Sequence, residues 1–597
     1  GDRGSMHLDL DNVEGAAGDY RLELRSDGVN VVGNAPPQAL RLAARQRSAV
    51  TVPLVAPASA GTANVVVRVS GPGGFALERS YALAVKPATQ VLARRTVRSI
   101  AQGESITLSN DLLADLVPGT GAVSLSVGVS TALDAAALLA ALDRYPFGCS
   151  EQITSRALPL LYVNDLASEA HLSLDTAVDE RIRNAIDRLL ARQGSNGSFG
   201  LWSAGGEDAW LDSYVTDFLT RARERGIAVP DVAFKLAVDR LRNFVSNVEE
   251  PNKTGGRNLA YALYVLARNG AAPIGDLRYF ADTKLDDFAT VIAKAQIAAA
   301  LGMLGDRARA ERVYAAALRS IGAPVLEYGR TDYGSMLRDA AALVTLAAEG
   351  GAARATILSA VQKVEEARGL TSYTSTQENA WMVLAARAIA KDATNVSLDI
   401  AGEKTQGALN RRFRADGLAA PVRVTNTSDG ALQAVVTVSG APLVPEPAAD
   451  RGFKIERLYF TLDGKPANPA RAKQNDRFAV VLKITEPKPT FARVMVVDYL
   501  PAGFEIDNPR LVSSGETGTL SWIENAQEPV NSEFRDDRFS AAFERKAEDP
   551  AVFTVAYVVR AVSPGRYVLP QAYVEDMYRP DRFGRTGTSA IEIAAAR

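Results

Sequence analysis

The sequence predicts a multidomain protein that is all-β at both ends and all-α in the middle, with β-sandwiches on either side of a helical ring. Its 597 residues are several times the usual length of one domain. Alternating, β-branched segments occupy the two ends, whereas the middle repeats alanine and leucine at three- and four-residue spacing. The strand pattern resumes directly after the helices, so we expect the helical domain to be inserted into one β domain.

The predicted domains follow each other in a fixed order. They are a β-sandwich at 1–90, the first part of a split β domain at 91–130, a helical ring at 131–393, the second part of the split domain at 394–442 and a terminal β-sandwich at 450–597. The first sandwich contains the strand patterns DYRLELRS, SAVTVPLVAP and ANVVVRVSG, with Gly, Pro and Asn between them. We leave the first seven residues, GDRGSMH, out of the fold prediction as a cloning remnant or an internal cut, because they have no apolar signal segment.

About a dozen helical stretches are expected in the middle region, among them RIRNAIDRLLARQ and TQENAWMVLAARAI. Alternate connections are longer and combine Gly, Ser and aromatic residues: GSNGSFGLWSAGG, EYGRTDYGS and GLTSYTSTQ. Helical hairpins with similar long loops on alternate turns indicate an α/α barrel, with those loops gathered at one end.

The β pattern returns at NVSLDIAG, APVRVTN and LQAVVTVSG, which we interpret as the missing strands of the interrupted sheet. The stretch APLVPEPAAD is typical of a linker. Beyond it, RFAVVLKIT, ARVMVVDYLP and VFTVAYVVRAV predict the strands of the terminal sandwich.

Composition excludes several classes of function. Lys and Arg number 67 against 69 Asp and Glu, for a net charge of −2, so nucleic acid is not an expected partner. No apolar run reaches the roughly 18 residues of a membrane helix. One cysteine, Cys149, and two histidines, His7 and His171, exclude internal disulfides and leave too few ligands for a typical metal centre. We expect no cofactor.

Cys149 is the centre of the one motif that carries chemistry, YPFGCSEQ, just before a predicted helix. A helix N-terminus can stabilise a thiolate. A lone cysteine can also be an inert core residue, or the nucleophile of a hydrolase that takes its base from His171 or His7. The third reading is an internal thioester: a bond from the Cys149 sulfur to the side-chain carbonyl of Gln152 closes a ring of about 15 atoms, expels ammonia and masks the thiol.

The segment GCSEQ resembles the Cys-x-Glu-Gln thioester motif of the α2-macroglobulin and complement superfamily, and YPFGCSEQ is close to bacterial α2-macroglobulins. RQGSNGSFGLW and STQENAW are similar to stretches of that family's thioester domain, and RGFKIERLYFTLDG and VEDMYRPDRFGRTG to its last domain. The resemblance implies macroglobulin-like sandwiches at both ends and a CUB-type split domain around an α/α-toroid thioester domain. Ser150 fills the variable position of the motif, and we expect it and Glu151 to support the bond.

The resemblance implies a suicide-type protease inhibitor rather than an enzyme. Proteolysis of a bait region would uncover the thioester, and a lysine amine of the protease would attack the Gln152 acyl carbon while Cys149 leaves. No histidine follows His171, so the histidine-assisted route of complement-like members is closed. We expect this chain to be the C-terminal part of a longer periplasmic protein, anchored to the inner membrane, with further macroglobulin domains, the bait region and envelope or peptidoglycan-synthesis proteins among its partners.

Two other groups of residues are candidates for function. Tyr145 and Met577 are predicted to shield the thioester from water. A hydrolase of the glycosidase type is the alternative function, using Asp212 and the acids before it beside tryptophans that would stack on sugar. Those neighbouring residues are Glu207, Asp208, Trp202 and Trp210. They can equally be helix-start acids and packing residues.

Overall fold

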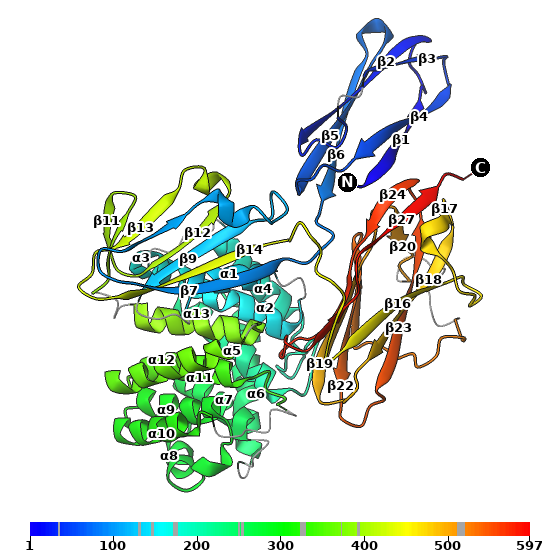
Figure 1. Cartoon of the computed structure of the whole chain (residues 1–597). Helices are drawn as coiled ribbons and strands as arrows, with labels where there is room; N and C mark the ends of the chain where they lie inside the picture. Colours follow the sequence, from blue (N-terminus) through cyan, green and yellow to red (C-terminus); the bar gives the residue numbers. More distant parts are fainter. Residues whose placement is uncertain are drawn as a thin grey trace.

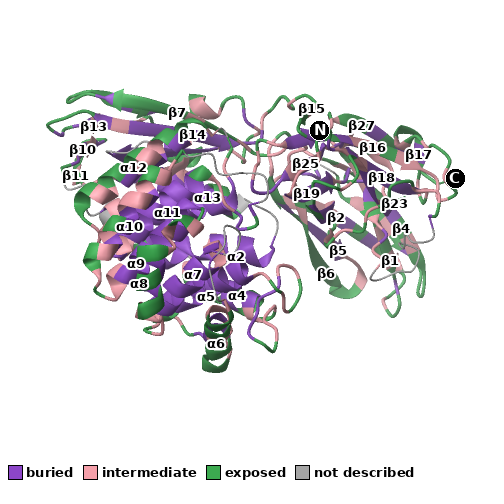
Figure 2. Cartoon of the chain, turned by 90° about the horizontal axis from the view of Figure 1, so that it is seen from below, coloured by how far each residue is buried: buried purple, intermediate pink, exposed green. Residues whose placement is uncertain are grey.

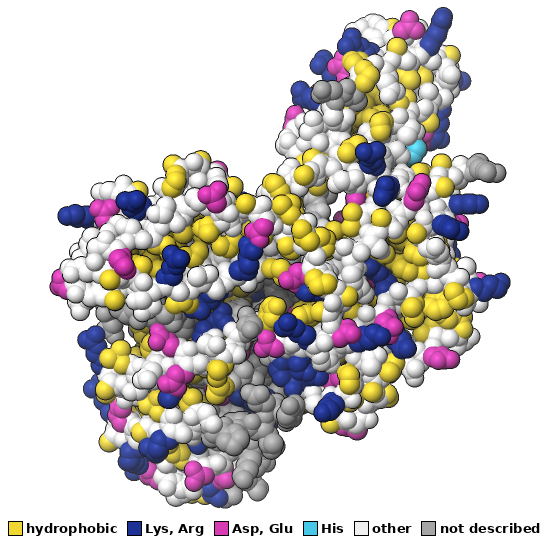
Figure 3. Space-filling view, in the orientation of Figure 1, with side chains coloured by type: hydrophobic (Ala, Val, Ile, Leu, Met, Phe, Trp, Pro, Cys, Tyr) yellow, Lys and Arg dark blue, Asp and Glu magenta, His cyan; other side chains and the backbone are white. Residues whose placement is uncertain are grey.

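The computed structural model in Figure 1 describes the chain except for residues 34–35, 129–132, 145–147, 171–176, 249–250, 252–255, 323–329, 372, 391–394, 510–519 and 597, and the side chains at 144 and 168–170. It confirms the predicted fold class, with β-sandwiches around a helical domain. On the face shown in Figure 3, acidic and basic side chains are interspersed, as the near-zero net charge predicts. Among the described residues, no helix is long and apolar enough to cross a membrane.

The N-terminal sandwich has a four-stranded sheet in the order β3-β2-β5-β6 and, facing it, the β1-β4 pair. Its strands are β1 (Arg3–Asp11), β2 (Gly18–Gly28), β3 (Gln38–Leu42), β4 (Arg47–Val55), β5 (Gly61–Ser70) and β6 (Ala76–Val85). Valines and leucines alternate inward and form a separate core. Leaving out the first seven residues was wrong: β1 begins at Arg3, pairs with β4 along its whole length and touches β24 of the terminal domain through Arg3 and Arg566.

The next β domain is split by the helices. β7 (Leu92–Ile100), β8 (Ser105–Leu108) and β9 (Ala122–Gly128) precede them, and β10 (Ser397–Ile400), β11 (Glu403–Gln406), β12 (Leu409–Arg414), β13 (Val422–Asn426) and β14 (Leu432–Gly440) follow. The two sheets have the orders β11-β10-β13-β8 and β12-β9-β14-β7. Strand β14 pairs with β7 and β9 on either side, so the sheet is complete only when both parts of the chain are present. Its CUB-type classification stays a prediction from the resemblance.

The helical domain is a ring of hairpins. Its helices are α1 (Ala135–Arg144), α2 (Ser150–Ala157), α3 (Val163–Ala170), α4 (Val178–Leu190), α5 (Ala209–Glu224), α6 (Asp231–Asn247), α7 (Gly256–Arg268), α8 (Ile274–Thr283), α9 (Val291–Met303), α10 (Arg307–Ser320), α11 (Met336–Glu349), α12 (Arg354–Gly369) and α13 (Thr376–Ala390). α2, α5, α7, α9, α11 and α13 pack in that order, and α13 returns to α2. Figure 2 shows these helices mostly buried, whereas helices such as α6 expose one face.

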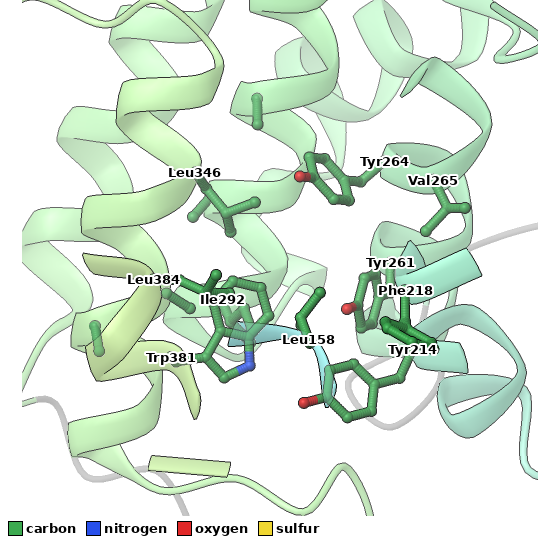
Figure 4. Close-up of a cluster of buried hydrophobic side chains, with 14 of the residues drawn as sticks. Leu158, Tyr214, Phe218, Tyr261, Tyr264, Val265, Ile292, Leu346, Trp381 and Leu384 are labelled. Atoms are coloured by element: carbon green, nitrogen blue, oxygen red, sulfur yellow. The ribbon is translucent and has the colours of Figure 1, made fainter. Parts of the chain in front are cut away.

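Apolar packing inside this ring explains why α2 is held in place. Aromatic and aliphatic side chains from different helices point toward one another in Figure 4, among them Leu158, Tyr214, Tyr261, Ile292 and Trp381. Leu158 directly follows α2 and is fully buried. Burying such a side chain contributes about 1.5–3 kcal/mol, so the end of α2 is anchored in the largest core of the molecule.

The terminal sandwich has one sheet in the order β15-β26-β25-β19-β22-β21 and another in the order β16-β18-β23-β20. The strands are β15 (Ala449–Arg451), β16 (Lys454–Phe460), β17 (Ala472–Lys473), β18 (Arg477–Thr485), β19 (Ala492–Tyr499), β20 (Phe504–Ile506), β21 (Asn531–Phe534), β22 (Arg538–Arg545), β23 (Val552–Ala561), β24 (Gly565–Leu569), β25 (Ala572–Asp576), β26 (Phe583–Arg585) and β27 (Ser589–Ala594). β17, β24 and β27 join β1 and β4 in a further sheet. The face of β19 and β22 toward the helices places Met495, Val497 and Ala542 in the helical core cluster, so the two domains share apolar packing.

Candidate functional site

Cys149 and Gln152 lie together at the N-terminus of α2. Cys149 is the N-cap residue, and the backbone N–H of Gln152 donates to its Sγ at 3.5 Å. In return, the backbone N–H of Cys149 donates to Oε1 of Gln152 at 3.3 Å. These reciprocal bonds form a capping box, which folds the two side chains toward each other. Both residues are fully buried, so the arrangement brings the sulfur to the carboxamide out of contact with water.

Ser150 fastens this helix start to the loop that follows α4. Its backbone N–H donates to the carbonyl of Leu201 at 2.8 Å, and its hydroxyl donates to the carbonyl of Gly200 at 2.6 Å. Arg192 donates to the same Leu201 carbonyl at 3.1 Å and to the Ser150 hydroxyl at 3.3 Å. The side chain at the variable motif position therefore holds backbone in place.

Glu151 points into the domain as a buried carboxylate. It accepts hydrogen bonds from Ser155 at 2.5 Å, from Gln377 at 2.8 Å, from Thr376 at 3.2 Å and from the Tyr578 hydroxyl at 2.5 Å. Burial raises the pKa of this carboxyl, and the four donors oppose that rise. Glu151 thus connects α2, α13 and the terminal domain.

Met577 covers the site from the terminal domain. The Gln152 amide donates to the Met577 sulfur at 3.3 Å, and the backbone N–H of Met577 donates to the carbonyl of Arg493 on β19 at 2.9 Å. Met577 is only 3% exposed because the turn after β25 faces the helical domain. The other predicted shield, Tyr145, lies outside the described residues.

Three residues that sequence reasoning missed complete the contact between the domains. The ring of Tyr578 packs edge-on against Tyr333 with 5.0 Å between centroids, and the Arg493 guanidinium lies 3.8 Å from the Tyr333 ring centroid. The Tyr333 hydroxyl donates to Asp208 at 2.6 Å. Tyr333 belongs to EYGRTDYGS, one of the long loops of similar composition, and that similarity could have marked it as a site residue. Nothing local in the sequence indicates that Arg493 belongs to the site.

The electrostatics of the site favour a neutral thiol. Burial, and then the charge of Glu151, raise the pKa of Cys149 to about 12. The Gln152 N–H, the Arg192 charge and the nearby Tyr578 hydroxyl act in the opposite direction. The expectation that the helix N-terminus would favour a thiolate is therefore wrong for this buried position. A nucleophilic cysteine hydrolase does not fit such a thiol.

The carboxylates of the alternative hydrolase have structural partners. Asp212 is 1% exposed and accepts hydrogen bonds from the backbone of Phe199 at 2.7 Å and from Arg240 at 3.0 Å. Asp208 caps α5. Trp202 is half-buried and Trp210 is packed between tyrosines, while the exposed Glu207 lies 3.5 Å from Arg240. These groups stabilise the loop and the start of α5, and they do not form an open carboxylate pair.

The histidines supply no base to the site in the described part of the chain. His7 lies on β1, where its ring bonds with the Thr51 hydroxyl at 2.8 Å. His171 lies outside the described residues. Within the described ranges, no three His, Cys, Asp or Glu side chains are grouped so that they could hold a metal ion.

Comparison with known proteins identifies the class to which this fold and site belong. Residues 452–581 match the family model described as bacterial α2-macroglobulin MG10 domain, and residues 123–241 match the macroglobulin TED domain. The α2-macroglobulin of Escherichia coli K12 is 30% identical over 97% of this chain, which spans 36% of that relative's length. The chain thus contains domains of the bacterial α2-macroglobulin type and resembles the C-terminal region of these proteins.

Solved structures agree over the whole chain. Native E. coli α2-macroglobulin from domain MG7 to the C-terminus is 27% identical, with a TM-score of 0.86 over 99% of this chain and 97% of that one. Salmonella α2-macroglobulin reacted with methylamine is 29% identical, with a TM-score of 0.87 over 100% of this chain and 40% of that one. The arrangement of the helical ring and terminal sandwich is thus shared with these proteins.

Proposed function

We propose that Cys149 and Gln152 form an internal thioester and that this chain is the acylating part of a protease inhibitor. The Cys149 sulfur attacks the carboxamide carbon of Gln152, ammonia leaves, and a carbon–sulfur bond takes the place of the carbon–nitrogen bond. An amine later attacks the same carbon, which forms an amide and returns Cys149 as a thiol. Atoms balance in both steps, and neither needs a metal or a cofactor.

The observation that carries this proposal is the buried capping box under a cover from another domain. The two side chains are folded together by the 3.3 and 3.5 Å bonds, and the cover, Met577, comes from a separate sandwich. A thioester in contact with water would be lost, so exclusion of water is needed before activation. Because the cover is a neighbouring domain, a rearrangement can remove it. The likeness to Salmonella α2-macroglobulin reacted with methylamine supports an amine-reactive site.

The targets that fit this site are lysine amines of attacking proteases. An unassisted amine is a better nucleophile toward a thioester than a hydroxyl, and no histidine follows His171 to form an acyl-imidazole. In this proposal, cleavage of a bait region elsewhere in a longer protein opens the contact with the terminal domain. The protein would act in the bacterial periplasm, and each molecule would react once.

Thiol titration tests this function. The native protein should show no free thiol, and methylamine should release one thiol per chain. Cys149→Ala is the control that should release none while it stays folded. A native thiol that reacts at once, with no increase after methylamine, would contradict the proposal and favour a structural cysteine.

A further inference from the structure

Glu151 is bound by donors from two domains, the helical ring and the terminal sandwich. Ser155 belongs to α2 itself, and Thr376 and Gln377 begin α13. The fourth donor, the Tyr578 hydroxyl, comes from the terminal sandwich and binds Oε2 at 2.5 Å. If the terminal domain moves away, the three internal donors stay and Tyr578 leaves. Domain opening would therefore change the hydrogen bonding of one carboxylate oxygen next to the motif.

That oxygen lies at the end of α2 that carries the reacting atoms. The Tyr578 hydroxyl donates its proton to Oε2 of Glu151 at 2.5 Å, and Tyr578 and Glu151 both act on the pKa of Cys149. Tyr578 directly follows Met577, whose sulfur lies 3.3 Å from the Gln152 amide at the N-terminus of α2, so the hydroxyl and the carboxylate border the reacting pair. An amine that attacks the Gln152 carbon beside this sulfur arrives in the space that the Tyr578 hydroxyl has left.

The reaction with an amine requires a proton acceptor at this point. When the amine adds to the acyl carbon, its nitrogen becomes positively charged and carries a proton that the amide product lacks. Burial and the Glu151 charge raise the pKa of Cys149 while the domains are closed, and Glu151 stays beside the sulfur after the terminal domain has moved. A raised thiol pKa makes sulfur a poorer leaving group, so the adduct can expel the amine again unless a base removes the proton.

We propose that Glu151 is the proton acceptor for the attacking amine and that the Tyr578 hydroxyl keeps it occupied while the domains are closed. This inference rests on the proposed thioester. The Glu151 carboxylate takes one proton from the nitrogen, the electrons of the carbon–sulfur bond leave with sulfur, and Glu151 returns the proton to sulfur. The net change converts amine and thioester to amide and thiol. In the closed protein, the same hydrogen bond stops Glu151 from assisting water.

The competing explanation is that Glu151 only ties α2 to α13 and that Tyr578 only blocks access. The substitution Tyr578→Phe separates the two, because it keeps the ring against Tyr333 and removes only the hydroxyl. Tyr333→Phe is the matched control, since it removes an interface hydroxyl that binds Asp208 and not Glu151. Each change is made in the parent and in the Glu151→Gln background.

Intact mass is measured first, to show loss of ammonia in every variant, and thiol release by methylamine is then timed. General base catalysis contributes about 10²–10⁴-fold, so we expect Tyr578→Phe to speed release at least about tenfold in the parent and less than about threefold with Glu151→Gln. Tyr333→Phe should have the same effect in both backgrounds. An equal acceleration by Tyr578→Phe in both would overturn the proposal. A parent without ammonia loss would instead overturn the thioester itself.

A second measurement covers the case in which Glu151→Gln prevents bond formation. Thiol release by water from Tyr578→Phe is followed from pH 4 to 8. Two other titratable residues face Glu151 in this variant, Cys149 and Tyr214. Cys149 has no free thiol while the thioester is closed, and burial raises the pKa of Tyr214 far above pH 8. We expect the rate to fall where Glu151 takes up a proton, above the ordinary carboxyl range because burial raises its pKa. If the rate of thiol release by water instead rises tenfold for each pH unit, in proportion to the hydroxide concentration, the proposal is overturned.

Discussion

Replacing Met577 with alanine should speed the reaction of the site with small amines. Met577 is 3% exposed and its sulfur lies 3.3 Å from the Gln152 amide, so the substitution removes apolar cover at the domain contact. Truncating a buried methionine costs about 2–5 kcal/mol. At the lower limit, about 2 kcal/mol lost from the closed state alone raises the open fraction about 30-fold, since about 1.4 kcal/mol is a factor of ten.

The assay is thiol release under a fixed excess of methylamine, and the expected rate is about 30-fold above the parent. Leu482→Ala is a matched control, because Leu482 is fully buried inside the terminal sandwich and belongs to its separate core. It should lower the stability of that domain and leave the rate near the parental value. The reasoning is refuted if Met577→Ala reacts at the parental rate, or if both variants accelerate alike.

Two further outcomes follow from the chemistry of the site. Gln152→Ala cannot close the bond, and since burial raises the pKa of Cys149 to about 12, alkylation of this variant should be slow at pH 8 and rise about tenfold for each pH unit toward pH 12. A plateau near the ordinary cysteine pKa of about 8.5 would show an accessible thiol. In competition at neutral pH, methylamine should be acylated much faster than glycerol, and efficient transfer to glycerol would contradict a preference for amines.

The fold was predictable because each element repeats a local pattern. A β-branched, largely apolar run marks strands such as β14, and three- and four-residue spacing marks α4 and α13. The resumption of strands after the helices indicated the split domain, whose two parts pair at β14. Near the N-terminus, β1 was partly missed because its first residues, Arg3 to Ser5, have no apolar side chain and are exposed or half-buried.

The site was only partly predictable. The spacing of Cys149 and Gln152 is local, and one helical turn brings them together. The contact of Met577 with Gln152 spans 425 residues, so Tyr578, Tyr333 and Arg493, which complete it, depend on how two domains dock. No single segment contains that information.

The position of Cys149 at a helix start was not enough to predict the protonation state of its thiol. A charge at a helix end gains about 0.3–1 kcal/mol from the dipole, less than the 1.36 kcal/mol of one pKa unit. Burial and Glu151 raise the pKa of Cys149 to about 12, well above the ordinary value of about 8.5, so they outweigh the dipole. Sequence shows the helix start, but the burial arises from the ring and the terminal domain together.

Intact mass of the native protein tests the central claim most directly. If Cys149 and Gln152 are joined, the native mass is lower than the sequence mass by one ammonia, and methylamine adds its own mass when it opens the bond. Cys149→Ala should show neither change. A native mass equal to the sequence mass, unchanged by methylamine, would contradict the thioester and with it the proposed function.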